Sequence, residues 1–320
     1  MQEWRPSAAL STLRERVRLL VRLRDFFDQR DVLEVSTPVL SAAAATDPAL
    51  DSLAVEMGGG GQRWLHTSPE FPMKRLLAAG SGDIWQLCTV FRDGERGRWH
   101  NPEFSLLEWY RLGLDEYQMA AEVVTLIEML AEGYRELAPA QYLTYREAFV
   151  CHAGLDPLAA SDDEVAEAAM RVVATGGPGR WQRSDWLDLL GGAVVYPALG
   201  RGHLAVLTDY PADQAALARI KPGNPPLAAR FEVFLDGVEL ANGFHELTDA
   251  QEQRRRFEAD LACRRQAGKA IVAQDECLLS ALEYGLPDCA GVALGLDRLL
   301  ALLLGCDSLA GVMAFDFTRA

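Results

Sequence analysis

The stretch of sequence that decides the fold is FRDGERGRWHNPEFSLLEWY, which covers residues 91–110. Its apolar flanks predict two strands, Ile84–Phe91 and Phe104–Tyr110, joined by a charged loop that contains glycine. Arg92 stands at the start of this loop, where a planar guanidinium group can clamp a phosphate. Phe104 can present a flat apolar face to a purine ring. The pattern favours a nucleotide-binding loop, with an ordinary solvated loop as the alternative.

A hairpin further along the chain carries a second group of polar residues. Its turn is predicted at the DG dipeptide of residues 236–237, which favours the tight turns of β-hairpins. Glu232 and Glu239 lie on opposite arms, so their carboxylates can together hold a hard cation such as magnesium. Asn242 and Glu246 follow among apolar residues, and a half-buried carboxylate needs a partner such as an ammonium group. The hairpin therefore predicts sites for a metal ion and for a cationic ligand.

A third segment lies near the C-terminus, where Gly291 and Gly295 allow close approach of another backbone or of a ligand. Arg298 begins an apolar helix behind them, and a lone charge there is costly unless an anion meets it. On the second strand of the first segment, Glu108 and Tyr110 alternate and therefore point to one face. Each segment alone also fits ordinary structure, but functional signals of this kind rarely occur together by chance.

Apolar residues at helical spacing predict several helices. These are Leu10–Arg30, Asp115–Leu137, Val165–Val173 behind a capping box of Ser161 and Glu164, Asp249–Ala267 and Asp275–Tyr284. A short β-prone run, Val32–Val35, is ended by Pro38, because proline cannot continue a central strand. Glycine-rich loops are predicted at residues 58–61 and 175–179.

Charge and composition exclude several classes of function. With 31 Lys and Arg against 46 Asp and Glu, the net charge is −15, which gives no whole-molecule attraction for RNA or an anionic membrane. The six cysteines show no zinc-site spacing, and Walker A and Gly-x-Ser-x-Gly motifs are missing. The longest apolar run, Leu299–Cys306, is too short to span a bilayer, and charges interrupt the N-terminus. We therefore expect a soluble cytoplasmic protein with reduced thiols.

Taken in order, these segments resemble the three motifs of class II aminoacyl-tRNA synthetases. Leu10–Pro38 is similar to motif 1, which forms the dimer interface in that family, while residues 91–110 resemble motif 2 and residues 291–298 resemble motif 3. Shorter matches to the lysine branch are TSPE at 67–70, HNPEF at 100–104, EWY at 108–110 and ELANGFHE at 239–246. The resemblance implies an α+β fold, with an antiparallel sheet flanked by helices. It also implies a homodimer and a single catalytic domain over residues 1–320.

Two departures separate the chain from lysyl-tRNA synthetases. Few residues stand before the motif 1 helix, so we expect neither the β-barrel anticodon-binding domain nor binding of tRNA. Ala293 replaces a glycine that is usual in motif 3 of that enzyme. Both features resemble lysyl-tRNA synthetase paralogues that transfer (R)-β-lysine to a lysine side chain of elongation factor P, as do MKRLL at 73–77 and PDC at 287–289. The implied enzyme is an ATP-dependent, AMP-forming ligase with an aminoacyl-adenylate intermediate and magnesium as its metal.

The resemblance also implies roles for individual residues. Arg92 and Arg298 would be catalytic, with Arg92 on the α-phosphate and the substrate carboxylate, and Arg298 on the γ-phosphate. Magnesium would be held by Glu232 and Glu239. Phe104 would stack on the adenine of ATP. Further contacts with ATP would come from His100, Asn101 and Glu239. The lysine-type substrate would contact Ser68, Glu70, Glu108, Tyr110, Asn242, Glu246 and Ala293.

One position in the nucleotide loop departs from the family. Gly94 stands where the family has an acidic residue and Glu95 follows it, so one contact on the adenine side is expected to differ. Two alternatives stay open: a free-standing lysyl-tRNA synthetase-like enzyme, and a non-catalytic paralogue that senses an amino acid. The second would be expected to lose its phosphate and metal residues, yet all are present. The sequence leaves open the choice between α- and β-lysine and the surface that docks an acceptor protein.

Overall fold

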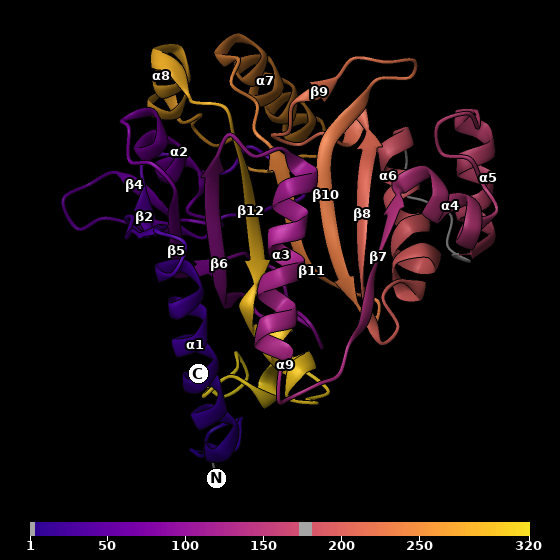
Figure 1. Ribbon diagram of the computed structural model, residues 1–320. Helices are drawn as coiled ribbons and strands as arrows, with labels where there is room; N and C mark the ends of the chain where they lie inside the picture. The colour runs from indigo at the N-terminus through magenta and orange to yellow at the C-terminus, as the bar shows by residue number, and fades with distance from the viewer. Residues whose placement is uncertain (1–3, 173–180) are drawn as a thin grey trace. The chain divides into compact units, whose positions relative to one another are not determined.

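The structure is a computed structural model that describes residues 4–172 and 181–320 (Figure 1). It divides into two units, which are described separately. Unit 1 comprises Met1–Gly113 and Thr248–Ala320, and unit 2 comprises Leu114–Leu247. A single catalytic domain over the whole chain stays a prediction.

Unit 1 is built on a sheet with the strand order β1-β5-β6-β12. Its strands are β1 (Leu33–Glu34), β5 (Ile84–Phe91), β6 (Glu103–Leu112) and β12 (Cys289–Gly295). β1 runs parallel to β5, whereas β5, β6 and β12 are antiparallel neighbours. The predicted strand, loop and strand of residues 84–110 are therefore confirmed, as is the short strand after the first helix.

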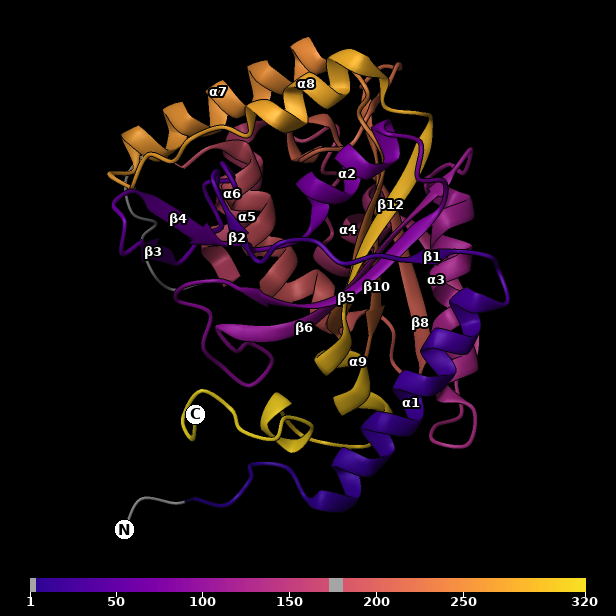
Figure 2. The same ribbon diagram turned by 90° about the vertical axis from the view of Figure 1, so that its left-hand side faces the viewer.

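Helix α1 (Leu10–Asp28) covers one face of this sheet, as Figure 2 shows. Near its C-terminal end, Phe27 stacks on Trp85 of β5 with ring centroids 4.7 Å apart, and it meets Trp109 of β6 edge-on at 5.5 Å. Such aromatic pairs add about 0.5–1.5 kcal/mol to the burial of the rings themselves. Glu108 and Tyr110 are the residues directly before and after Trp109 on β6. Because side chains alternate along a strand, both lie on the face away from α1.

The other elements of unit 1 are a small antiparallel sheet and further helices. The small sheet has the order β2-β4-β3 and consists of β2 (Leu40–Ser41), β4 (Gln62–Leu65) and β3 (Ala54–Glu56). The glycine-rich loop predicted at residues 58–61 is confirmed, and it joins the antiparallel strands β3 and β4. The helices are α2 (Glu70–Ala78), α7 (Ala250–Gln266), α8 (Glu276–Gly285), α9 (Leu296–Leu303) and the short η4 (Leu309–Gly311). Arg264 of α7 is buried and donates to the Asp51 carboxylate at 2.9 Å, which ties the segment before β3 to that helix.

Unit 2 has the strand order β11-β10-β8-β7, with β9 paired to β10. Its strands are β7 (Ala138–Thr144), β8 (His203–Pro211), β9 (Ile220–Lys221), β10 (Leu227–Leu235) and β11 (Val238–His245). β7 and β8 are parallel, and the other pairs are antiparallel. The predicted turn joins β10 to β11, and both Asp236 and Gly237 adopt positive φ angles, 50° and 76°, so the hairpin prediction is confirmed.

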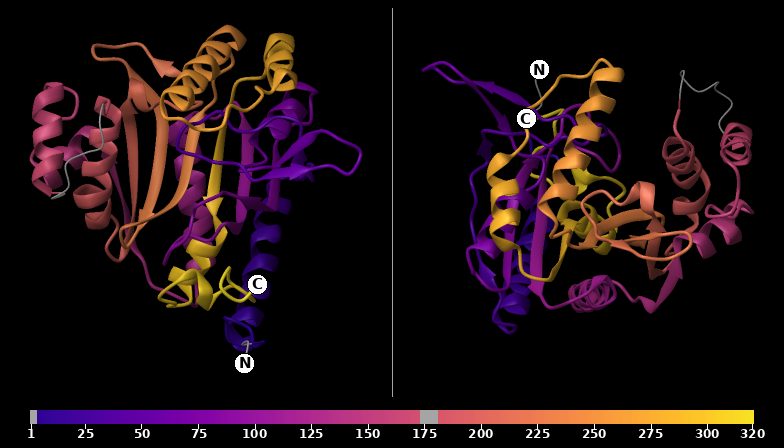
Figure 3. Two further views of the ribbon diagram at one scale, coloured as in Figure 1. Left: turned by 180° about the vertical axis from the view of Figure 1, so that it is seen from behind. Right: turned by 90° about the horizontal axis from the view of Figure 1, so that it is seen from above.

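The helices of unit 2 pack around these strands. Helix α3 (Glu116–Ala131) packs against β8, β10 and β11. Helix α4 (Tyr145–Ala153) packs against β7 and β8, whereas α5 (Asp162–Val172) packs against α6 (Arg183–Leu190), as Figure 3 shows. Tyr145 of α4 stacks on Phe149 at 4.3 Å and meets Tyr210 of β8 at 4.8 Å, which forms the centre of a buried core. The short helices η1 (Gly191–Val195), η2 (Tyr196–Ala198) and η3 (Ala212–Gln214) complete the unit.

One helix prediction for unit 2 is wrong at its end. The sequence pattern predicts a helix as far as Leu137, but α3 ends at Ala131. Glu132 leaves the helical conformation, with φ −54° and ψ 123°, and Gly133 adopts φ +82°, which favours glycine. The capping box of Ser161 and Glu164 is confirmed in front of α5. The loop predicted at residues 175–179 lies outside the described residues.

The predicted α+β class is confirmed, because each unit combines mainly antiparallel strands with flanking helices. All six cysteines are free thiols, as expected. Within residues 4–172 and 181–320, no helix has both the length and the apolar character needed to cross a membrane.

Candidate active site

Glu108 lies at the centre of a polar row on the face of the unit 1 sheet away from α1. It stands on β6, opposite Gln86 on β5 and Ala293 on β12. Tyr110, two residues further on, stands opposite Gly291. Glu108 is 2% exposed, whereas the methyl-bearing Ala293 is partly exposed. Two residues predicted to contact the substrate, Glu108 and Ala293, are therefore direct neighbours across two strands.

Both oxygens of the Glu108 carboxylate accept hydrogen bonds. Ser68 Oγ donates to Oε2 at 2.7 Å, and the Tyr110 hydroxyl donates to Oε1 at 2.7 Å. Hydrogen bonds to a carboxylate are strong, so they hold this group in one orientation. Burial and then the charge of Glu108 raise the pKa of the nearby Cys88 thiol to about 12. The row therefore presents a buried carboxylate in a fixed orientation, which suits a ligand that carries an ammonium group.

Glu70 begins helix α2 and is joined to this row through Ser68, because its N–H donates to Ser68 Oγ at 2.9 Å. Its carboxylate accepts a hydrogen bond at 2.6 Å from the Lys74 ammonium one turn later. Lys74 is 2% exposed, and a buried ammonium needs such an anion. Sequence reasoning missed Lys74, although the i, i+4 spacing of opposite charges on a helix is a signal that could have found it.

Arg92 opens the predicted nucleotide loop, and its side chain is partly exposed. Its guanidinium lies 3.6 Å from the Glu95 carboxylate and 5.1 Å from the centroid of the Phe104 ring. Gly94 adopts φ +77°, which favours glycine at this position. Arg92 and Phe104, both predicted to bind ATP, are thus brought together.

The far end of this loop is tied to the C-terminal segment by Asn101, which is 8% exposed. Its Nδ2 donates to the carbonyl oxygen of Glu103 at 2.6 Å, and its Oδ1 accepts from the N–H of Phe317 at 3.0 Å. His100 is exposed, and its main chain pairs with Gly97. The Asn101 side chain therefore supports the loop structurally, and ATP contacts by Asn101 and His100 stay predictions.

Arg298 is the third residue of α9, directly behind β12. Its Nε donates to the carbonyl oxygen of Trp99 at 3.0 Å, so the guanidinium lies against the nucleotide loop. The preceding residue, Asp297, is buried and accepts from Arg16 of α1 at 2.5 Å and from the N–H of Ser105 at 2.7 Å. Asp297 thus joins α9 to α1 and β6, and it fixes the start of the helix that carries Arg298.

In unit 2, a β-bulge determines which residues of the hairpin share a face. Glu232 stands opposite Asn242, and Phe234 stands opposite Glu239, so Leu240 is an extra residue on β11. The three-residue spacing of Glu239 and Asn242 would place them on opposite faces of a regular strand. The bulge turns both to the face of Glu232. The prediction that Glu232 and Glu239 lie on opposite arms is confirmed, but the direct neighbour of Glu232 is Asn242, and Glu239 is its diagonal neighbour.

Glu232 is 5% exposed and sits in a cluster of polar side chains. Burial and then the charge of Glu239 raise the pKa of Glu232 to about 7, while Arg230 and the Tyr210 hydroxyl act in the opposite direction. Arg230 donates to this carboxylate and lies over the Tyr210 ring, 4.5 Å from its centroid. Sequence reasoning missed Arg230 and Tyr210. Two carboxylates that repel each other form a donor set that a divalent cation would stabilise.

In the part of the chain that the structure describes, no group of three or more His, Cys, Asp or Glu side chains is arranged to hold a metal ion. A site with two carboxylates fits magnesium, which commonly uses one or two protein carboxylates together with water and substrate phosphates. Glu232 and Glu239 fit that pattern, whereas a structural zinc site would need more ligands. Magnesium binding by this pair stays a prediction.

Asn242 lies on β11, and Glu246 directly follows the last residue of that strand. The Oδ1 atom of Asn242 is buried, and the described residues offer it no hydrogen-bond donor. Glu246 is 1% exposed, and Arg219 donates to its main-chain carbonyl oxygen at 3.2 Å. A buried acceptor and a buried carboxylate together suit a ligand that brings several N–H donors, such as an ammonium group.

The structure thus gathers the predicted residues within each unit. In unit 1, one set consists of Ser68, Glu70, Glu108, Tyr110 and Ala293, and another consists of Arg92, His100, Asn101, Phe104 and Arg298. In unit 2, the set consists of Glu232, Glu239, Asn242 and Glu246. The individual roles of these residues stay predictions.

Comparison with known proteins identifies the family. A family model described as tRNA synthetases class II (D, K and N) matches residues 2–319. The chain is 46% identical over 324 residues to the elongation factor P–(R)-β-lysine ligase of Vibrio vulnificus (strain YJ016). The aligned region covers 99% of each of the two chains. It is 45% identical to the ligases of the same name from Vibrio cholerae, again over 99% of each chain, and from Edwardsiella ictaluri, over 100% of this chain and 99% of the relative. The prediction of an ATP-dependent ligase is confirmed, and the chain belongs to the family of class II tRNA synthetases (D, K and N).

Proposed function

We propose that this chain activates (R)-β-lysine with ATP as an aminoacyl adenylate and transfers it to a lysine side chain of elongation factor P. The relatives that carry this activity in their names match the chain from end to end, which supports the proposal. The observation that carries most weight in the structure is the buried Glu108 carboxylate, held by Ser68 and Tyr110 beside Ala293. Because the reaction uses ATP and a translation factor, we expect it to take place in the cytoplasm.

In the first step, the substrate carboxylate attacks the α-phosphorus of ATP, an acyl–phosphate bond forms, and pyrophosphate leaves. We assign Arg92 to the α-phosphate and Arg298 to the γ-phosphate, where each stabilises charge without covalent catalysis. Phe104 would stack on adenine beside Arg92. Magnesium held by Glu232 and Glu239 would neutralise phosphate charge.

In the second step, an uncharged lysine amine of the acceptor protein attacks the acyl carbon of the adenylate. An amide bond forms, the bond to phosphate breaks, and AMP leaves with the electron pair. Within unit 1, we assign recognition of the amino acid to Glu108 and Tyr110. Within unit 2, Asn242 and Glu246 are buried acceptors of the same kind. Each of these offers oxygen atoms to an ammonium group.

The experiment that tests the proposal is ATP–pyrophosphate exchange with (R)-β-lysine, α-lysine and other amino acids, followed by transfer to elongation factor P or tRNA. We expect exchange with β-lysine above all others and transfer to the protein. Transfer to tRNA alone would favour the free-standing lysyl-tRNA synthetase-like enzyme. Binding of lysine without any exchange would favour the non-catalytic paralogue.

The methyl group of Ala293 should influence which lysine isomer is used. Ala293 is partly exposed beside Glu108, so its methyl group takes space next to the proposed amine site. One methyl group is worth roughly 1–3 kcal/mol of discrimination. Ala293→Gly should therefore raise kcat/KM for α-lysine and lower the ratio of β- to α-lysine, with little change for ATP.

The matched control for this variant is Ala290→Gly, on the opposite face of the same strand. It introduces the same backbone freedom without changing the face of Glu108. Both proteins are assayed for kcat/KM with the two isomers. An unchanged isomer ratio in Ala293→Gly would show that the choice is made elsewhere.

We also propose a homodimer formed through α1. Leu10, Val17 and Val21 recur at helical spacing on its outer face and are 65%, 60% and 53% exposed, whereas its inner face is buried. Leu33, which follows on β1, is 55% exposed. Such a row fits an isologous interface, in which the same patch meets its copy.

Val17→Glu should shift the protein from dimer to monomer, because two copies of a carboxylate would be buried at the symmetric contact. Tyr284→Glu on α8 is the control, since Tyr284 is also exposed but lies outside this row. Light scattering at micromolar concentration measures both. A monomeric wild-type protein would contradict the proposal.

A further inference from the structure

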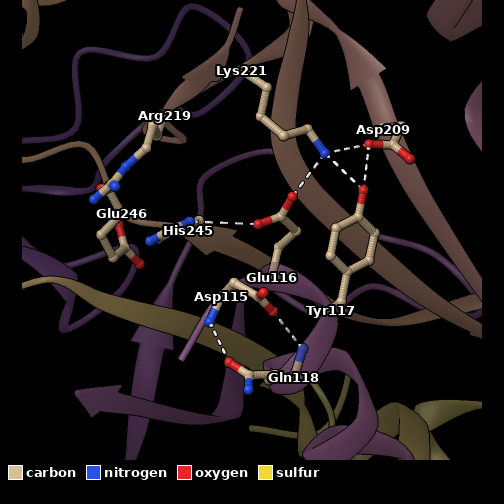
Figure 4. Close-up of polar contacts among 9 residues, drawn as sticks. All are labelled: Asp115, Glu116, Tyr117, Gln118, Asp209, Arg219, Lys221, His245 and Glu246. Carbon is tan, nitrogen blue, oxygen red and sulfur yellow. Dashed lines mark hydrogen bonds and ion pairs between the residues drawn. The ribbon is translucent and has the colours of Figure 1, made fainter. Parts of the chain in front are cut away.

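A network of charged side chains lies in unit 2 beside the residues assigned to the amino acid (Figure 4). Glu116, at the start of α3, accepts from the Lys221 ammonium at 2.7 Å and lies 3.5 Å from Nδ1 of His245. Lys221 also binds Asp209 and donates to the Tyr117 hydroxyl at 2.9 Å. Nothing in the proposed reaction uses this network.

The centre of the network is a fixed, ionised carboxylate. Glu116 is 2% exposed. Burial acts to raise its pKa, but hydrogen bonds with His245 and then Lys221 outweigh it and lower the pKa to about 2. The position of Glu116 in the first turn of α3 adds to this effect, because helix N-termini stabilise anions. Asp115 and Gln118 cap the same helix end reciprocally, so the carboxylate is anchored on a rigid element.

This anchored carboxylate meets β11 at its last residue. The strand ends at His245, and the next residue is Glu246. Because side chains alternate along an extended chain, His245 on the α3 side implies that Glu246 points to the opposite face, which it shares with Asn242. Backbone pairing continues past the strand end, where Glu246 bridges Ala218, and a one-residue slip there would turn Glu246 away from that face.

A second contact holds the same strand end from the neighbouring segment. The N–H of Arg219 donates to the His245 carbonyl oxygen at 2.9 Å, and its guanidinium donates to the Glu246 carbonyl oxygen at 3.2 Å. Lys221, two residues later, returns to Glu116. Residues 219–221 and α3 therefore hold residues 245–246 from two sides.

We propose that His245 and Glu116 are positioning residues, which fix the end of β11 so that the Glu246 carboxylate faces the ammonium group of the amino acid. The inference rests on the proposed function. It adds to that function the contacts, made by His245 and Glu116, that set the orientation of Glu246. In this assignment neither residue contacts the substrate, so the effect should appear in amino acid binding and not in ATP binding.

The test compares KM for β-lysine and KM for ATP in pyrophosphate exchange. His245→Ala should raise KM for β-lysine roughly 10-fold, because small misplacements of a binding group are costly, and should leave KM for ATP within about 2-fold. His245→Asn, whose side-chain amide can replace Nδ1, should restore most of the affinity. Tyr117→Phe is the control, since it removes a hydroxyl from the far side of the same network.

An unchanged KM for β-lysine in His245→Ala would overturn the inference, as would an equal rise in both KM values. If His245→Ala does not fold, the same two KM values in Glu116→Gln decide the question by the same criteria. A wild-type protein that activates no lysine isomer would instead reject the proposed function, so the two failures are distinguishable.

Discussion

Replacing Arg298 with alanine should lower the rate of adenylate formation roughly 10²- to 10³-fold while leaving the fold intact. The Arg298 side chain is partly exposed, and its Nε donates a hydrogen bond to the Trp99 carbonyl oxygen. Its loss removes little buried surface, whereas the neighbouring Asp297 keeps its contacts with Arg16 and Ser105. A donor that stabilises charge in the transition state is worth roughly 10²- to 10³-fold in kcat. We therefore expect a loss of that size without a comparable fall in stability.

The measurement is ATP–pyrophosphate exchange with β-lysine at saturating ATP, together with thermal unfolding. Arg254→Ala on α7 is the matched control, because Arg254 forms an exposed ion pair with Glu276. Exposed pairs of this kind contribute about 0–1 kcal/mol, and this one lies outside the proposed site. Exchange in Arg298→Ala within a few-fold of the wild type would remove Arg298 from the mechanism.

The sequence was sufficient to predict the strands that carry the candidate site residues. Residues 84–110 contain two apolar stretches with a charged loop between them, and this pattern predicts β5 and β6. The DG turn lies between two β-prone runs, and this pattern predicts β10 and β11. These patterns also place Glu108 and Tyr110 on one face, because strand alternation has only two outcomes. The alternation rule holds only where the strand is regular.

The β-bulge at Leu240 shows where that rule stops. Nothing in the residue types around Leu240 distinguishes a regular strand from a bulged one, and only the pairing with β10 reveals it. A regular strand would have turned Asn242 to the face opposite Glu239. The shared face of Glu232, Glu239 and Asn242 was therefore beyond local sequence reasoning.

Partners distant in sequence were missed for a related reason. Glu116 and His245 are 129 positions apart along the chain (245 − 116), and neither is unusual in its local pattern. Only the packing of α3 against β11 brings them together. Lys74 was within reach, since its pair with Glu70 follows the helical i, i+4 spacing.

Removal of the Glu232 carboxylate should destabilise the protein, which tests whether this residue has a structural role besides metal binding. Arg230 donates to Glu232, and its side chain is only 17% exposed, so Glu232→Ala leaves a largely buried guanidinium without its nearest anion. Breaking such a pair on one side typically costs 3–5 kcal/mol. Because Glu239 also lies near Arg230, we expect a loss at the lower end, about 3 kcal/mol, in the free energy of unfolding.

The double variant Glu232→Ala/Arg230→Met is the decisive comparison. It removes both charges and fills the space with an apolar side chain, so it should recover most of the stability lost in Glu232→Ala. Urea denaturation of the wild type, both single variants and the double variant gives the coupling energy directly. A double variant no more stable than Glu232→Ala would show that the pair is not what stabilises this part of the hairpin.

Magnesium supplies the second readout for the same proteins. If Glu232 and Glu239 hold the ion, magnesium should raise the unfolding temperature of the wild type, because a ligand that binds only the folded state stabilises it. The double variant should recover stability but not this response, since it lacks one of the two carboxylates. Stability and magnesium response would then change independently, as expected if Arg230 holds Glu232 in place while the carboxylate itself serves the metal. A full magnesium response in the double variant would place the ion elsewhere and leave Glu232 with a structural role alone.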